Sequence, residues 1–172
     1  MNTVSQTNST PPWGSGGGGF TSRYFTLQEL TRSQTARQRG LDNTPDAAVV
    51  ENLQSLVTHI LDPLRQLWGS PLYVNSGYRS PAVNAAVGGA RNSQHLTGCA
   101  ADITAGSPKK NRKLLKLILL HFAPAYSPPS REGSGVGLSF DQLIAERCDS
   151  NGNPRWLHLS YSPRPRRQLL RT

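Results

Sequence analysis

The sequence predicts an α+β fold, with helices in the earlier part of the chain and antiparallel strands at its end. The first observation is a stripe of apolar side chains that recur at helical spacing from Pro45 to Leu67. The second is a pair of strand-like runs, residues 140–147 and 155–161, joined by a connector rich in turn formers and therefore expected to form a hairpin. We expect a small antiparallel sheet with helices packed mainly on one side.

Shorter elements are expected on both sides of the long helix. Thr26 and, three residues later, Glu29 fit a capping box at the start of a short helix within residues 25–39. After the long helix, a strand is expected over residues 72–75 and a short helix over residues 80–87, with proline at its first position.

The later part of the chain predicts a strand over residues 100–104 and an amphipathic helix over residues 109–122. A loop rich in proline, serine and glycine follows over residues 123–137. Within the long helix, the pair Asp62-Pro63 is expected to cause a kink or to begin a final turn, because proline lacks the N–H that an inner helical turn requires.

Composition divides the chain into three parts. Residues 1–22 are rich in Ser, Thr, Asn, Pro and Gly and are expected to form a flexible arm. Residues 163–172 contain four arginines and two prolines and are expected to form a loosely ordered basic tail. Residues 23–162 remain as one domain, which is long enough to build a hydrophobic core.

The chain carries 19 Lys and Arg against 10 Asp and Glu, a formal net charge of +9. Such a surface attracts polyanions, but charge alone does not distinguish nucleic acid from an acidic membrane or an anionic wall polymer. The basic runs at residues 109–116 and 164–171 are first interpreted as a solvated face and a solvated tail. The polar N-terminus and the short aliphatic cluster at residues 114–120 predict no signal peptide and no stable membrane insertion.

Metal-ligating residue types occur at two places. His95 and Asp102 are seven positions apart, a span of about 23 Å in an extended chain, so the chain must double back at Gly98 for both to reach one ion. His158 is the candidate third ligand. Two imidazoles and one carboxylate would leave a fourth tetrahedral position open, as catalytic zinc requires. Judged by spacing alone, a histidine in such a position more often has a structural role than a metal-binding one. His59 is also assigned a structural role.

Two motifs resemble the zinc D-alanyl-D-alanine carboxypeptidase family, which includes VanX-type dipeptidases and phage endolysins and shares its fold with the hedgehog signalling domain. They are S-x-H-x-x-G-x-A-x-D at residues 93–102 and W-x-H-x-S at residues 156–160. The similarity extends over residues 24–161 and includes the string Ser76-Gly77-Tyr78-Arg79-Ser80. The resemblance implies that His95, Asp102 and His158 bind Zn²⁺. It also implies that Arg79 binds substrate and stabilises charge on the scissile carbonyl, the alternative being a structural ion pair.

The general base is less directly indicated. Relatives carry an acid three positions before the last ligand, where this chain has Arg155, or a histidine two before it, where this chain has Trp156. Glu146, at the end of the preceding strand, is therefore assigned as the base, with Asp141 as the second choice. The alternative role for Glu146 is a cross-strand pair with Arg155.

Further cleft residues are assigned by position. Ser93 is expected to cap or orient the ligand loop, and Tyr78, Trp156 and Tyr161 to shape the substrate cleft, although aromatic residues near a core often serve packing alone. Cys99 is assigned no metal role. With no C-x-x-C spacing, Cys99 and Cys148 can be reduced or joined to each other.

The resemblance implies a zinc metallopeptidase that acts on D-Ala-containing stem or cross-bridge peptides of peptidoglycan. We expect a monomeric phage lysis enzyme, made in the host cytoplasm without a signal peptide and released to the wall through a holin, with no nucleic-acid partner. Two alternatives remain. One is a zinc-bearing binding module without turnover, and the other is a basic virion-associated or nucleic-acid-associated protein.

Overall fold

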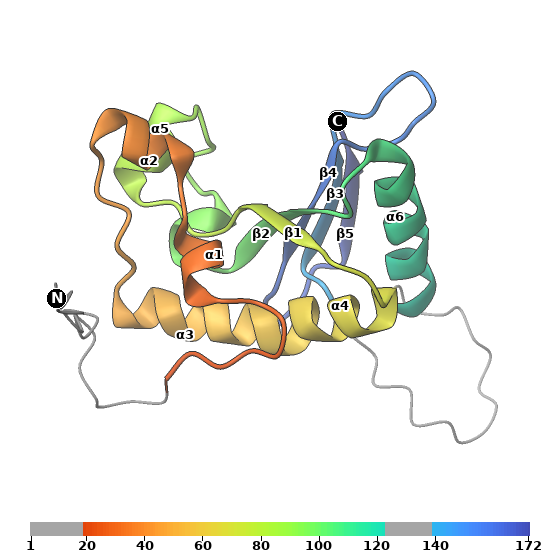
Figure 1. Ribbon diagram of the computed structural model, residues 1–172, viewed down its shortest axis with the longest axis horizontal. Helices are drawn as coiled ribbons and strands as arrows, with labels where there is room; N and C mark the ends of the chain where they lie inside the picture. The colour runs from red at the N-terminus through yellow and green to blue at the C-terminus, as the bar shows by residue number, and fades with distance from the viewer. Residues whose placement is uncertain (1–18, 123–138) are drawn as a thin grey trace, which may run out of the picture.

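The computed structural model describes residues 19–122 and 139–172, which form one sheet with helices around it (Figure 1). The helices are α1 (Leu27–Thr31), α2 (Gln34–Arg39), α3 (Ala47–Leu56), α4 (Asp62–Trp68), α5 (Pro81–Ala86) and α6 (Pro108–Phe122), with a π-helical turn η1 (Val57–Leu61) and a 3-10 turn η2 (Gln94–Thr97). The strands are β1 (Tyr73–Ser76), β2 (Ala100–Thr104), β3 (Gln142–Glu146), β4 (Trp156–Ser160) and β5 (Gln168–Arg171). The predicted α+β class is confirmed.

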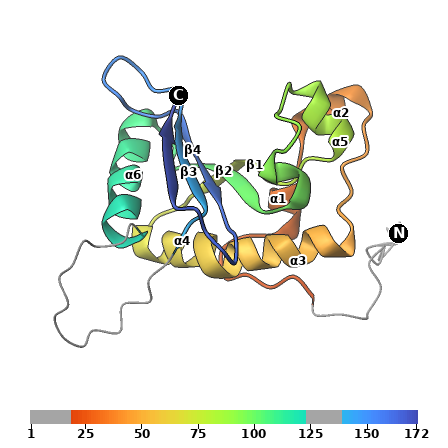
Figure 2. The ribbon, with the colours of Figure 1, turned by 180° about the vertical axis from the view of Figure 1, so that it is seen from behind.

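The strands form one sheet in the order β1-β2-β4-β3-β5. Neighbours are antiparallel except β5, which runs parallel to β3. The expected hairpin is confirmed, because β3 and β4 are antiparallel neighbours. From both sides of the molecule, α3 and α4 run along one end of the sheet, and α6 lies on the opposite side of the sheet from α2 and α5 (Figures 1 and 2).

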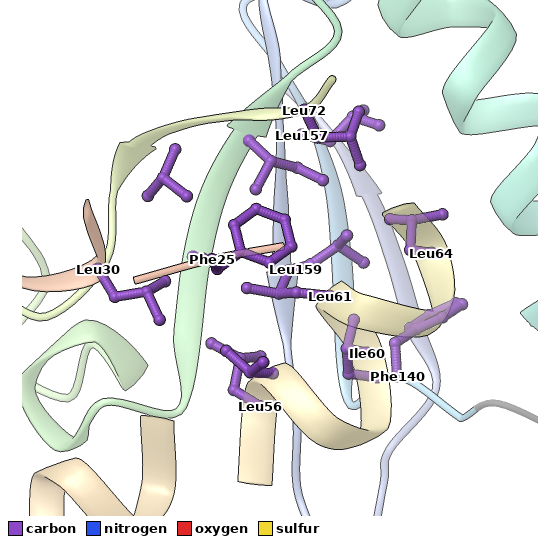
Figure 3. Packing of buried hydrophobic residues seen from close by; sticks show 14 of the residues in the cluster. Phe25, Leu30, Leu56, Ile60, Leu61, Leu64, Leu72, Phe140, Leu157 and Leu159 are labelled. Carbon is purple, nitrogen blue, oxygen red and sulfur yellow. The ribbon is translucent and has the colours of Figure 1, made fainter. Parts of the chain in front are cut away.

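The long helical stripe is confirmed and supplies much of the core. Its side chains Leu53, Leu56, Ile60, Leu61 and Leu64 are fully buried, and several of them pack beside Phe25, Leu157 and Leu159 in Figure 3. The helix does not stop at the Asp62-Pro63 pair. Instead it widens into the π-helical turn η1 immediately before the Asp62-Pro63 pair, because proline cannot donate to the preceding turn and its ring crowds the carbonyl there.

Alternation along the strands separates the sheet into two faces. The core face carries small and aliphatic side chains that are all buried, namely Ala101, Ile103, Leu143, Ala145, Leu157 and Leu159. The alternate positions point the other way, and there the register places Asp102 directly opposite His158. The same pleat that builds the core therefore brings two of the three candidate ligands together.

The structure differs from the expected chain ends. Residues 163–172 do not form a loose tail, because they include β5, which pairs along β3. Of the expected arm, residues 1–18 lie outside the described residues, as does the expected loop at 123–137. The remaining arm residues contact the long helix: the Thr21 N–H donates to Gln54 Oε1 at 2.7 Å, and the Ser22 hydroxyl donates to Asp62 at 2.7 Å.

One smaller difference concerns local structure. The helix expected within residues 25–39 is two helices, because Ser33 is extended and caps α2 through its hydroxyl, which breaks the helical path. The capping box of Thr26 and Glu29 is present at the start of α1. Among residues 19–122 and 139–172, no helix combines the length and the apolar character needed to cross a bilayer.

Candidate metal centre

The candidate ligands lie in a cleft between the sheet and the segment that joins α5 to η2. The cleft has a volume of about 530 Å³. Residues 87–90 and 92–95 line one side, and the outward positions of β3 and β4 line the other. A larger hollow of about 630 Å³ lies between residues 21–24 and the long helix, but Asp62 is its one carboxylate and is bonded to Ser22 and the Arg23 backbone. The chemistry-bearing side chains therefore point to the smaller cleft.

Three donor atoms converge there from three separate segments. His158 Nδ1 lies 3.0 Å from Asp102 Oδ1, His95 Nε2 lies 3.3 Å from the same oxygen, and the two imidazole nitrogens are 3.1 Å apart. Ligands about 2.0–2.1 Å from a tetrahedral zinc are separated by about 3.3 Å. The spacing of all three atoms therefore fits one divalent ion, and these residues form a metal-competent group within the described part of the chain.

The tautomer of His95 supports the same conclusion. Its Nδ1–H donates to the Gly77 carbonyl at 2.6 Å, which leaves the lone pair of Nε2 directed at Asp102 and His158. The imidazole is buried, with 2% of the residue exposed, so water does not separate these groups. Three electron-pair donors brought this close repel one another unless a cation or a proton lies among them. The donor set thus fits a metal ion.

The ligand loop folds as the His95–Asp102 spacing requires. His95 lies in the turn η2, whose N-cap Ser93 accepts a hydrogen bond from the His95 N–H at 3.4 Å. Gly98 ends the turn with φ +73°, a conformation that favours glycine, and a Cβ there would lie 2.8 Å from the Val49 carbonyl oxygen. The chain then enters β2 and reaches Asp102. The expected reversal at Gly98 and the capping role of Ser93 are both present.

Asp102 is held in its ionised form. Burial opposes ionisation, but the hydrogen bond with His158 and the other close contacts to the two imidazoles outweigh it and hold the pKa of Asp102 well below its ordinary value. Its second oxygen accepts from Arg79 Nη2 at 3.1 Å, and Arg79 Nε donates to Ser76 Oγ at 3.0 Å. Arg79 therefore forms an ion pair with a candidate ligand while also lining the cleft.

The two candidate bases lie in different environments. Glu146 lines the cleft and is paired with Trp156 in the β3–β4 register, one position along the same face from the Ile144–His158 pair. Glu146 and His158 are therefore diagonal neighbours across the two strands. The Cα atoms of such a pair lie about 7–8 Å apart. Among the described residues, no ion pair joins Glu146 to Arg155, whose backbone N–H donates to the Glu146 carbonyl instead.

Asp141 is already engaged. It is 2% exposed, its oxygens accept from Arg166 Nε and Nη2, the shortest contact being 2.6 Å, and it also accepts from Gln94. The hydrogen bonds from Arg166 hold the pKa of Asp141 below its usual range. An occupied carboxylate with a low pKa is a poor proton acceptor, which favours Glu146 of the two.

Of the three aromatic candidates, Trp156 lines the cleft, whereas Tyr78 and Tyr161 lie elsewhere. Trp156 lines the cleft and lies within cation–π distance of Arg147, 5.4 Å from the guanidinium carbon to the ring centroid. Tyr78 belongs to the hydrophobic core instead, and burial raises its pKa. Tyr161 stacks on His59, with ring centroids 4.5 Å apart, away from the cleft lining. Cys99 and Cys148 are both free.

Sequence reasoning missed two kinds of site residue. Ser76 and the Gly77 carbonyl hold Arg79 and His95 in place, and their part in the S-G-Y-R-S string was the available signal. Arg166 also lines the cleft, although composition placed it in a tail. A salt bridge to a buried aspartate 25 residues earlier leaves no local pattern from which it could be found.

The fold and the three converging donor side chains define an α+β protein with a site that could hold one metal ion. The chain belongs to the peptidase M15 family, whose family model matches residues 23–122. It is also 40% identical over 85 residues to the "Zinc D-Ala-D-Ala carboxypeptidase" of Streptomyces albus G, a match that covers 48% of this chain and 32% of the relative. The chain thus matches about a third of that relative's length. The resemblance seen in the motifs is confirmed.

Proposed function

We propose that this chain is a zinc-dependent peptidase that hydrolyses D-Ala-containing peptides of bacterial peptidoglycan. The observation that carries the proposal is the convergence of His95, Asp102 and His158, with donor atoms 3.0–3.3 Å apart, in a cleft that also holds a carboxylate. Membership of the peptidase M15 family and the similarity to a zinc D-Ala-D-Ala carboxypeptidase support both the metal and the substrate class.

The chain's own residues can perform the steps that peptide hydrolysis requires. A zinc ion held by the three ligands would supply Lewis acidity that activates water and polarises a carbonyl. Glu146 is placed in the same cleft to accept a proton from water and to pass it to the leaving amine. The peptide substrate would lie between Glu146 on β3 and the segment of residues 87–95.

Arg79 is fixed before substrate arrives. Two of its nitrogens are hydrogen-bonded, to Asp102 and Ser76, and among the described residues Nη1 makes no hydrogen bond. That nitrogen is the one available to donate to a developing oxyanion. The fixed guanidinium would give the stabilising charge without reorganisation during the reaction, while its other edge keeps Asp102 oriented.

We further propose that the protein acts on the wall as a phage lysis enzyme. Its net charge of +9 suits an anionic cell envelope. The test is clearing of outer-membrane-permeabilised cells by the purified protein, compared at low and high salt. Failure to clear such cells while isolated peptidoglycan is cleaved would argue against the lysis role alone.

The peptidase proposal is tested by digesting purified peptidoglycan with and without a chelator and identifying the fragments by mass. Cleavage should disappear with the chelator and return with added zinc, and the products name the bond. His95→Ala should bind no zinc and cleave nothing, whereas His59→Ala, an exposed histidine outside the cleft, should retain both. Bound zinc without any cleavage would instead indicate a binding module.

A further inference from the structure

The strand β5 brings the end of the described chain to the candidate base. Its register along β3 runs from Gln142–Gln168 to Ala145–Arg171, so the next residue, Thr172, arrives beside Glu146. The two strands lie side by side at the edge of the sheet in both views (Figures 1 and 2). The Thr172 hydroxyl lies 2.7 Å from Glu146 Oε2.

The direction of this hydrogen bond is fixed by a second contact. The Arg147 N–H donates to Thr172 Oγ1 at 3.2 Å, so the hydroxyl oxygen is an acceptor on that side. A threonine hydroxyl has one proton. That proton must therefore point at the Glu146 carboxylate, where a charged acceptor makes a stronger hydrogen bond than a neutral one.

Thr172 is held by its backbone as well as by its side chain. Its N–H donates to the Ala145 carbonyl at 3.0 Å, and its carbonyl accepts from the Cys148 N–H at 3.0 Å. Arg147 adopts φ +47°, a left-handed conformation that turns its N–H toward the hydroxyl. The hydroxyl is therefore presented by a fixed backbone, although the residue itself is exposed.

The segment of residues 166–172, which contains β5, is also held at its first residue, Arg166. Arg166 bonds the buried Asp141 through both its side chain and its backbone N–H, at 2.6 Å and 2.7 Å. The Gln168 N–H donates to the Asp141 carbonyl at 2.9 Å. With both ends fixed on β3, the segment cannot move away from Glu146 without breaking several hydrogen bonds.

We propose that Thr172 is a positioning residue for the general base. By donating to Oε2, it holds the Glu146 carboxylate in one orientation and leaves Oε1 as the oxygen that meets water. The proposal rests on the proposed role of Glu146 and extends the catalytic centre to the C-terminal strand. Thr172 touches neither substrate nor metal in this scheme and acts through Glu146 alone.

The experiment compares Thr172→Val, which keeps the shape and removes the hydroxyl, with Thr172→Ser, which keeps the hydroxyl. Thr172→Val should lower kcat about tenfold at unchanged zinc content, a part of the about 10²–10⁴-fold contribution of a general base. KM should change less than about twofold, because the substrate contacts remain. Thr172→Ser should restore kcat to within about twofold of the parent.

A matched control tests the strand itself. Gln168→Met removes the other side-chain bond between these strands, from Gln142 Nε2 to Gln168 Oε1 at 2.8 Å, at a point distant from Glu146. Its kcat should equal that of the parent. If Gln168→Met and Thr172→Val lose activity equally, β5 acts through stability alone, and the positioning role is wrong.

The failure of this inference can be separated from the failure of the proposed function. If Glu146→Gln is inactive while Thr172→Val has the parental kcat, the inference is overturned and the peptidase proposal stands. If Glu146→Gln is fully active, the assignment of the base fails and the inference with it. Crystals of Thr172→Val give a readout without substrate: the Glu146 carboxylate should occupy more than one rotamer, and the parental orientation alone would contradict the proposal.

Discussion

The region of the three candidate ligands and the region of the proposed base are built in different ways within the cleft. His95 donates to the Gly77 carbonyl, and Asp102 accepts from Arg79, which in turn donates to Ser76; both the His95 and the Asp102 side chains are largely buried. Glu146 is the last residue of β3, is partly exposed, and has Thr172 as its side-chain hydrogen-bond partner among the described residues. The ligands are fixed by many groups, whereas the base is fixed by few.

This difference predicts that substitutions can affect the proposed metal binding and the proposed catalysis separately. A change at the proposed base should leave the metal in place, because no hydrogen bond joins the Glu146 side chain to a candidate ligand among residues 19–122 and 139–172. A change in the hydrogen bonds around Asp102 should weaken metal binding before it alters the chemistry. Substitutions in the two regions can therefore test the comparison directly.

The largest expected effect is that of Glu146→Gln. Loss of the carboxylate removes the proton acceptor, so kcat should fall about 10²–10⁴-fold, while zinc content by elemental analysis stays at the parental level. Glu51→Gln, an exposed change of the same kind on α3, is the control and should behave as the parent. Loss of zinc together with activity would show that the two regions are not separable.

Arg79→Met should have the next largest effect, on the metal. The substitution removes the guanidinium that donates to Asp102. Removal of a group that hydrogen-bonds to a metal ligand typically costs about 10–100-fold in metal affinity or activity. Zinc affinity is measured by competition with a chelator, and kcat is measured at saturating zinc. A kcat that recovers fully at saturating zinc assigns Arg79 to the ion pair, whereas a persistent loss supports its proposed contact with the oxyanion.

The convergence of the three candidate ligands could be predicted from the sequence more directly than the surroundings of the proposed base, and the reason is physical. His95, Gly98 and Asp102 lie within one short segment, where chain reversal imposes a local requirement on residue type. His158 follows from the strand period, since its neighbours Leu157 and Leu159 must face the core. The long helical stripe was predictable for the same reason, because burial imposes a period on the sequence.

The C-terminal segment could not be predicted in this way. Its four arginines and two prolines are typical of a solvated tail, yet the backbone of residues 168–171 completes the sheet by pairing with β3. That pairing needs few apolar side chains, since Leu169 and Leu170 remain 45% and 37% exposed. The anchoring contact between Arg166 and Asp141 depends on tertiary structure alone.

Two glycines allow a test of how closely the loop of the candidate ligands is packed. Gly98 and Gly152 have similar φ values, +73° and +70°, but a Cβ at Gly98 would crowd Val49 and Leu53, whereas nothing lies within 4 Å at Gly152. Gly152→Ala should cost about 1 kcal/mol of unfolding free energy through backbone strain, and Gly98→Ala about 2–4 kcal/mol because overpacking adds to the strain. Denaturant titration measures both values. Equal costs would show that the ligand loop is free to shift.

The smallest expected effect concerns the base region and pH. The hydrogen bonds from Arg166 hold the pKa of Asp141 below its usual range, so the folded state binds this proton less readily than the unfolded chain. The stabilisation is therefore complete above the unfolded pKa and is lost as pH falls through the lower folded value. Arg166→Gln should lower the melting temperature by a few degrees at pH 7 and by less at pH 3.

Arg164→Gln removes the same charge from the same segment without a recorded side-chain contact to Asp141, and its melting temperature should follow the parent at both pH values. The comparison separates the specific ion pair from general charge repulsion in a chain of net charge +9. An equal shift in both variants would assign the effect to repulsion. A shift confined to Arg166→Gln identifies its bond to Asp141 as the contact that fixes the C-terminal segment beside β3.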